Sequence, residues 1–141
     1  MNDTNWEAQY NLLKAWANKK GYSVRAERGT ADCILFEDKI IYINSQAKYE
    51  YMFYTLLHEC GHLLTDNRKQ VFLEEHPLYP SDILDKRVQK SKAFKVCLLS
   101  EELSAWRKGL RLAKRLDLYV DKYKYHNAMV DALWSYVESV T

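Results

Sequence analysis

Apolar residues recur every three or four positions over long stretches of the chain, and this spacing predicts amphipathic helices. The first stretch covers residues 5–20 and ends before Gly21, a residue type that commonly follows the last turn of a helix. Its apolar positions are Trp6, Tyr10, Leu13 and Ala17. Two further stretches of this kind cover about residues 92–116 and 121–140. With only four glycines and two prolines in 141 residues, helices should dominate the structure.

Residues 22–44 show a different pattern, with short runs of β-branched and aromatic residues that are typical of strands. The three runs read YSVRA, CILFE and KIIYIN, and the last two are joined across Glu37, Asp38 and Lys39. We therefore expect a small antiparallel sheet in this part of the chain. Together with the helices on either side, it predicts an α+β fold in which this sheet or hairpin packs with helices.

A fourth helical pattern begins near Gln46, where Asn44 or Ser45 can act as the N-cap. Its apolar positions are Tyr49, Phe53, Leu56, Leu57, Leu63 and Leu64. Residues 66–92 follow as a polar excursion, in which a short helix is expected after Ser81. The predicted order is therefore helix, small sheet, helix, loop, helix, helix.

Length and composition are those of an ordinary globular protein. A chain of 141 residues suits a single domain that spans residues 1–141. Hydrophobic residues at 48% and charged residues at 28% argue against disorder. Twenty-one Lys and Arg against 19 Asp and Glu leave a net charge of +2, which is too small to predict a nucleic acid or an anionic membrane as partner.

Targeting signals and the spacing of the cysteines indicate the cellular compartment in which the protein is expected. No stretch approaches the roughly 18 to 20 apolar residues that a membrane span needs. The N-terminus lacks the basic patch and apolar run of a secretory signal. The three cysteines, Cys33, Cys60 and Cys97, have no C-x-x-C spacing, which excludes a Cys-rich zinc finger and fits reduced thiols. We therefore expect a cytoplasmic protein that does not insert into membranes.

Residues 58–62 read His-Glu-Cys-Gly-His, the H-E-x-x-H motif, within a segment that is predicted to be helical, as this motif requires. His58 and His62 lie on one face of such a helix, so they can bind one cation, and neutral imidazoles suit zinc. Glu59 would lie beside the metal, where it can take a proton from water. Gly61 costs about 1 kcal/mol relative to Ala within a helix, which indicates a close approach of another element. Alternatively, the pattern arises by chance and both histidines are ordinary polar residues of a helix surface.

A catalytic zinc site needs a third protein ligand. His76 and His126 are weak candidates because each is more typical of a surface residue, and no metzincin-type histidine follows His62. A carboxylate from a later helix is the remaining candidate for the third ligand, and two such carboxylates are Glu101 and Glu102. Glu102 shares its helix stripe with apolar and small residues that should face the interior: Leu98, Ala105, Trp106, Gly109 and Ala113. We favour Glu102 as the ligand and keep Glu101, whose stripe is more polar, as the substitute.

This set of motifs resembles the ImmA/IrrE-type metallopeptidases of bacteria, phages and other mobile elements. The likeness covers residues 30–116 and rests on the hairpin CILFEDKIIYIN, the zinc motif HECGH and the later helix EELSAWRKG. The resemblance implies a minimal zincin-like domain with His58 and His62 as zinc ligands, Glu59 as catalytic base and Glu102 as third ligand. Many members carry Glu-Ala-Asn-x-Phe-Ala in the second motif, a pattern that this chain does not share.

These residues predict a zinc-dependent metallopeptidase, a hydrolase that cleaves a peptide bond in a protein or peptide substrate. The resemblance implies a regulatory, repressor-type protein as that substrate. A second donor should stabilise the oxyanion besides zinc, and the sequence offers three candidates without ranking them: Tyr79, His76 and Tyr54.

Two other classes of function fit the same residues. In one, the chain is a non-catalytic protein-binding or regulatory module with a structural or vestigial zinc site. In the other, basic residues of one helix contact DNA: Arg107, Lys108, Arg111, Lys114 and Arg115. Such a run more often forms a solvated helix face, so nucleic acid is not expected as a direct partner.

The remaining conspicuous residues are interpreted as parts of the core. Cys60 lies two positions after His58, so its side chain points away from the predicted metal face. The four tryptophans are interpreted as core anchors rather than as a ligand-binding box: Trp6, Trp16, Trp106 and Trp134.

Overall fold

The computed structural model describes residues 3–66 and 92–139 of the chain. Over these ranges the chain forms, in order, α1 (Trp6–Lys19), β1 (Ser23–Glu27), β2 (Cys33–Leu35), β3 (Ile40–Asn44), α2 (Tyr49–Asp66), α5 (Lys92–Arg115) and α6 (Lys122–Ser139). The helices and the three-stranded sheet of the described ranges confirm the predicted α+β class. None of the described helices is long and apolar enough to cross a lipid bilayer. The short helix expected after Ser81 lies outside the described residues.

The sheet is mixed, which corrects the prediction of a wholly antiparallel sheet. β2 and β3 form the expected antiparallel hairpin, but β1 pairs in parallel with the other edge of β3, so the strand order is β1-β3-β2. Hydrogen bonds to Asn44, the last residue of β3, fix the connection between β1 and β2. The Gly29 amide donates to Asn44 Oδ1 (3.0 Å), and the Asn44 amide donates to Asp32 Oδ1 (2.7 Å). These bonds help place β2 on the far side of β3, a crossing that strand patterns alone do not encode.

Side-chain hydrogen bonds explain where the first two helices begin. Asn5 caps α1 by accepting a backbone amide of the first turn (3.0 Å), and Gly21 after its end adopts a positive φ of 91°. α2 begins at Tyr49, later than the predicted start near Gln46. The reason is that Asn44 Oδ1 accepts the Gln46 amide (3.1 Å) and so stabilises a turn before the helix.

α2 is the central element, because it packs against α1, the sheet, α5 and α6. Five of its side chains are fully buried: Phe53, Tyr54, Leu56, Leu57 and Cys60. The prediction that Cys60 belongs to the core is therefore confirmed. Trp106 is buried and Trp6 and Trp16 pack partly buried against the core, but Trp134 is 58% exposed on α6, so its interpretation as a core anchor is wrong.

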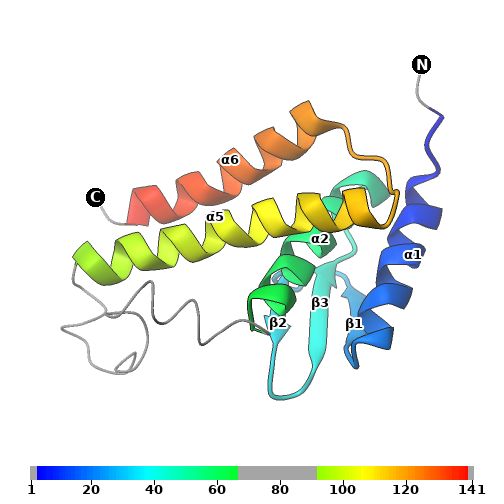
Figure 1. The fold of residues 1–141 in the computed structure, drawn as a ribbon, viewed down its shortest axis with the longest axis horizontal. Coiled ribbons are helices and arrows are strands. Elements are labelled where there is room, and N and C mark those ends of the chain that lie inside the picture. Colours follow the sequence, from blue (N-terminus) through cyan, green and yellow to red (C-terminus); the bar gives the residue numbers. More distant parts are fainter. Residues whose placement is uncertain (1–2, 67–91, 140–141) are drawn as a thin grey trace.

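α5 crosses α2 (Figure 1), and the two helices approach closely because small residues face the partner helix. Gly61 of α2 lies against the backbone of Ala105 in α5, and a methyl group on Gly61 would overlap the Ala105 carbonyl. One turn further along α5, Gly109 lies against the backbone of Leu57 in the same way. The expected close approach of another element at Gly61 is therefore confirmed. This crossing brings α5 next to the two histidines of α2.

α6 runs back antiparallel to α5 (Figure 1). Its first turn is capped by Asp121, whose side chain accepts the Lys124 amide (3.2 Å). Tyr125 is 3% exposed and donates its hydroxyl hydrogen to the Trp106 carbonyl (2.5 Å). The last helix is thereby fixed to the part of α5 that faces α2.

Candidate metal centre

His58 and His62 lie one turn apart on the face of α2 that meets α5. Their imidazoles converge, with the two Nε2 atoms 3.1 Å apart and the ring centroids 4.7 Å apart. His62 is 8% exposed, and the side chain of His58 is 13% exposed. The spacing of four residues thus brings the two rings together as predicted, in a largely buried position.

α5 places the carboxylate of Glu102 opposite these imidazoles. Glu102 Oε2 lies 2.8 Å from His58 Nε2 and 3.2 Å from His62 Nε2. Glu102 is 8% exposed, as expected for a residue on the inward stripe of its helix. Glu101, the substitute, is half-buried, and its negative charge acts on His62. Of the two glutamates, the structure brings Glu102 into hydrogen-bond distance of both imidazoles.

These three atoms are spaced much as ligands of one metal ion would be. Ligands at about 2.0 to 2.1 Å from a tetrahedral zinc ion lie about 3.3 Å from one another. The three separations here are 2.8, 3.1 and 3.2 Å. A second group of possible ligand atoms, all within 4.8 Å of one another, comes from His58, Glu59 and His62. In that group Glu59 Oε2 lies 3.9 Å from His58 Nδ1, whereas Glu102 lies beside the Nε2 atoms that converge. The described residues can therefore hold a metal ion, and Glu102 is the better placed of the two carboxylates.

Glu59 has the environment of a reactive carboxylate. It is 3% exposed, and its Oε2 makes no hydrogen bond within the described part of the chain. Burial raises the pKa of Glu59, although the charges of His58 and His62 offset part of that effect. A buried polar oxygen without a partner costs free energy, which is expected where a metal ion or a water molecule belongs. The donor set and this unpaired oxygen both fit a metal site.

Without a metal ion, the two histidines and Glu102 form a charged network. Burial raises the pKa of Glu102, but the hydrogen bonds from His58 and His62 outweigh it and bring this pKa to about 2. Burial also lowers the pKa of His62, but the hydrogen bond to Glu102 and the charge of that carboxylate outweigh it, so this pKa is raised. A proton and a metal ion therefore compete for the same imidazole.

Trp106 of α5 orients the ring of His58. The indole lies flat against the imidazole, with ring centroids 4.5 Å apart and an angle of 10° between the planes. Trp106 is 4% exposed, so the stacked pair has little room to rotate. The tryptophan interpreted as a core anchor thus also fixes the plane of a candidate metal ligand.

Tyr136 belongs to the site although no sequence motif marks it. It lies half-buried in α6, close enough to Glu102 for the charge of that carboxylate to act on its hydroxyl. Burial and the neighbouring carboxylates raise the pKa of Tyr136 to about 12, with Glu102 contributing most among them. The chain has eleven tyrosines, and only the packing of α6 on α5 selects this one. The one available signal is that Tyr136 shares the less exposed side of its helix with Tyr125.

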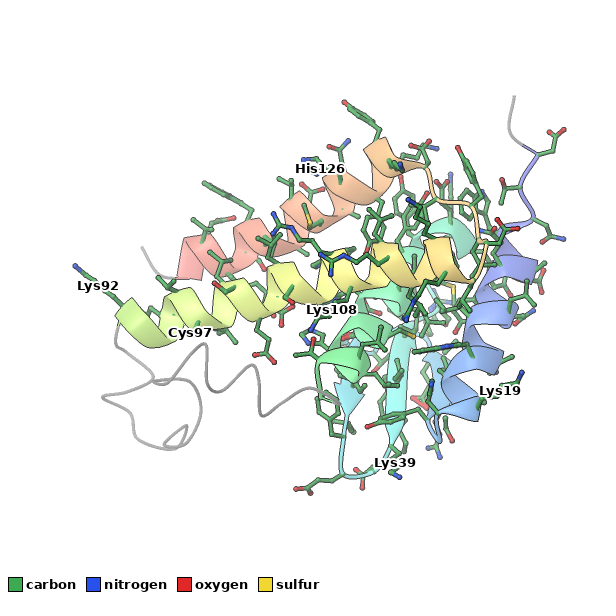
Figure 2. All side chains as sticks on the ribbon, in the orientation of Figure 1. Lys19, Lys39, Lys92, Cys97, Lys108 and His126 are labelled. Atoms are coloured by element: carbon green, nitrogen blue, oxygen red, sulfur yellow. The ribbon has the colours of Figure 1, made fainter. Side chains whose placement is uncertain are left out.

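Other residues considered from the sequence lie elsewhere. His126 is exposed near the start of α6 (Figure 2). Tyr54 is fully buried, and its hydroxyl donates to Glu50 Oε2 (2.7 Å) and accepts the Asp121 amide (3.2 Å). The structure therefore does not bring the Tyr54 hydroxyl to the histidines. Two further candidates lie outside the described residues: His76 and Tyr79.

A second polar contact joins α2 and α5 near the site. Thr65 donates to the Gly61 carbonyl (3.0 Å) and accepts a hydrogen bond from the ammonium group of Lys108 (3.1 Å). Lys108 is labelled on α5 in Figure 2. Lys108 therefore makes a contact within the molecule. The other cations of the basic run are exposed: Arg107, Arg111, Lys114 and Arg115.

Comparisons with known proteins supply no assignment, since no family model, curated protein or solved structure matches this chain. What the site can do must follow from its own residues. Two imidazoles and one carboxylate that can share a metal ion, with a buried carboxylate beside them, make up a set suited to activating water.

Proposed function

We propose that this chain is a zinc-dependent metallopeptidase in which His58, His62 and Glu102 hold the metal and Glu59 is the general base. The observation that carries this proposal is the convergence of two imidazole Nε2 atoms and Glu102 Oε2 within 3.2 Å of one another. Zinc suits this donor set because it binds nitrogen and carboxylate ligands tetrahedrally and keeps one position open when the protein supplies three.

Each residue of the site has a distinct role in the proposed reaction. Zinc, when bound, supplies a Lewis acid that polarises a peptide carbonyl and increases the acidity of water. Glu59 accepts a proton from the attacking water molecule at Oε2, which makes no hydrogen bond within the described residues, and returns it to the leaving amine. The raised pKa of Glu59 makes it a stronger base than an exposed glutamate. Trp106 holds the His58 ring in the plane that directs Nε2 toward the metal position.

The substrate class that we propose is a protein. The motifs HECGH and EELSAWRKG resemble those of ImmA/IrrE-type metallopeptidases of phages and other mobile elements. That resemblance points to a regulatory, repressor-type protein, whose cleavage would switch on genes of a mobile element or a stress response. The exposed cations of α5 are a separate surface, and the proposed reaction does not use them.

Glu59→Gln separates metal binding from catalysis. The amide cannot accept the proton, so the variant should bind one equivalent of zinc like the wild type and lose peptide cleavage. Zinc content is measured by elemental analysis, and cleavage is followed by mass spectrometry of a proteome-derived peptide library. Glu37→Gln, in the exposed turn between β2 and β3, is the matched control and should cleave like the wild type.

The outcomes of this experiment distinguish the possible functions. Cleavage by Glu59→Gln at the wild-type rate would contradict the role of Glu59. A wild-type chain that binds zinc but cleaves neither the library nor added proteins would instead support a non-catalytic module with a structural zinc site. A chain that binds no zinc would remove the basis of both functions.

A further inference from the structure

The outer face of α6 carries large apolar side chains that are exposed. Tyr123 is 77% exposed, Trp134 58% and Val130 45%. The opposite face of the helix packs against α5 and α2. We call the residues on the outward side the outer stripe: Tyr123, Asn127, Val130, Trp134 and Val137. A row of exposed apolar side chains, unlike single ones, indicates an interaction site.

The spacing of the outer stripe is that of helices that pack side by side. Tyr123, Val130 and Val137 follow one another at intervals of seven residues. Asn127 and Trp134 lie between them, so the stripe advances by alternating steps of four and three residues. This is the heptad pattern of paired helices in coiled coils, in which a single Asn commonly fixes the register. The outer stripe is therefore suited to pack against a second helix.

The charges of α6 indicate which helix would fit. Lys122 and Lys124 lie in its first turn and Glu138 lies in its last turn, all of them exposed. Lys124 is 3.5 Å from Glu50 of its own chain, but its side chain remains 49% exposed. This distribution opposes the helix dipole, which favours acidic residues near the start and basic residues near the end. An antiparallel second copy of α6 would compensate for it, because its acidic end would lie beside the basic start of the first copy. A parallel copy would place like charges together.

We propose that α6 pairs antiparallel with α6 of a second copy of this chain, so that the two outer stripes form the contact of a twofold-symmetric dimer. Because the same face serves both copies, it must be self-complementary, as the charges of α6 are in this direction. Full overlap of the stripes puts Val130 of both copies beside the twofold axis and Tyr123 beside Val137 of the other copy. A contact of one helix from each copy is small, so we expect a Kd on the order of micromolar or weaker. The contact does not involve the candidate metal site, so the proposal is independent of the proposed function.

Sedimentation equilibrium of the full chain tests the dimer. The wild type should shift from the mass of one chain toward twice that mass as its concentration rises to the order of 100 µM. Val130→Glu would place two carboxylates against each other at the twofold axis, so it should weaken the dimer by about tenfold or more. Leu12→Glu is the matched control, at an apolar side chain of α1 that is 60% exposed, and it should dimerise like the wild type. Circular dichroism checks that both variants keep their helices.

Intermolecular NOEs in a mixture of isotope-labelled and unlabelled protein give the direction of the two helices. The proposal predicts contacts between Tyr123 of one copy and Val137 of the other, and contacts between Tyr123 of both copies would overturn the antiparallel pairing.

Three other outcomes would also overturn the proposal. One is a wild-type chain that stays monomeric up to about 1 mM. Another is a dimer that Val130→Glu leaves unchanged. The third is a monomeric chain that cosediments with vesicles of phosphatidylcholine and phosphatidylserine and loses this binding in Trp134→Ala, which would assign the outer stripe to a membrane surface.

Discussion

A single oxygen atom, Oε2 of Glu102, lies within hydrogen-bond distance of both imidazoles of the site. The carboxylate to which this oxygen belongs also helps to raise the pKa of Tyr136. The negative charge of Glu102 therefore acts on every other member of the cluster at once. We expect the site to depend more on this residue than on any other carboxylate of α5.

Glu102→Gln should consequently remove most of the affinity for zinc. The amide keeps the size of the side chain but lacks the charge that a metal ion needs from its third ligand. The loss in Zn²⁺ affinity should exceed the roughly 10- to 100-fold that the loss of an outer partner costs. Chelator competition measures it, with Glu101→Gln as the neighbouring control on the same helix. A larger loss in Glu101→Gln than in Glu102→Gln would show that the substitute ligand is the correct one.

The pKa shifts predict how zinc binding depends on pH. The pKa of His62 is raised in the metal-free protein, so a proton occupies the imidazole at a higher pH than for an ordinary histidine. Zinc must displace that proton, so the affinity should be greatest above the raised pKa and fall by about tenfold per pH unit below it. Calorimetric titration with Zn²⁺ in two buffers of different ionisation enthalpy counts the protons released. Binding that releases no proton near about pH 6 would contradict this account.

Site residues whose place follows from the period of their own helix could be predicted from the sequence, whereas Tyr136 could not. His58, Glu59 and His62 follow from the helical period, and Glu102 follows from the inward stripe of its own helix. The charge of Glu102 acts on Tyr136 only because α6 packs antiparallel on α5 with a particular register. That register is set by bonds such as the one from Tyr125 to the Trp106 carbonyl, which no sequence spacing encodes.

At the scale of elements, the site exists because α2 and α5 cross without side chains between their backbones. Gly61 of α2 and Gly109 of α5 each lie against the partner backbone, at Ala105 and Leu57. A wider crossing would move Glu102 away from the histidines, because a glutamate side chain cannot span an additional layer of side chains. The glycines therefore act on the metal site through the distance between the helices.

Gly109→Ala tests this role of the crossing. In an isolated helix the change would stabilise by about 1 kcal/mol, because alanine has the higher helix propensity. Here the added methyl would overlap the Leu57 carbonyl and crowd the Tyr125 hydroxyl, so the protein should instead lose about 1 to 3 kcal/mol of unfolding free energy. Urea denaturation measures whether the unfolding free energy rises or falls, and Ser104→Ala on the same helix serves as the control. A stabilised Gly109→Ala variant would show that the helices are not in close contact.

The elements themselves were largely predictable, whereas their pairing was not. Helical periods locate α1, α5 and α6 to within a residue or two, and the hairpin of β2 and β3 follows from two strand patterns joined by a short polar turn. The parallel pairing of β1 with β3 depends on Asn44, whose amide and side chain bond the connection between β1 and β2. The same side chain delays the start of α2 to Tyr49. In each case a side-chain hydrogen bond overrides the local pattern.

At the scale of the whole molecule, a bound metal ion would join two helices that are far apart in sequence. The ligands that we propose come from α2 and α5, and Glu102 follows His62 by 40 positions in the sequence. A ligand that binds only the folded state stabilises it by an amount that grows with the logarithm of its concentration. The metal should therefore act as a link that holds the α2 and α5 crossing together.

Metal removal should lower the thermal stability of the chain. Zinc at a free concentration of about 100 times Kd adds about 2.7 kcal/mol to the unfolding free energy, which corresponds to a rise in Tm on the order of 10 °C for a chain of this size. Differential scanning calorimetry with a chelator, and then with excess zinc, measures this shift. In the Glu102→Gln variant, zinc should raise the Tm only slightly. A wild-type Tm that does not respond to zinc would mean that the metal does not bind the folded state.

The most direct test of the central claim is an anomalous difference map, recorded at the zinc absorption edge from crystals of the full chain grown with one equivalent of zinc. The proposed site predicts one strong peak at about 2.0 to 2.1 Å from the Nε2 atoms of His58 and His62 and from a carboxylate oxygen of Glu102. A map without a peak between α2 and α5, or with the peak on other residues, would contradict the proposed metal site.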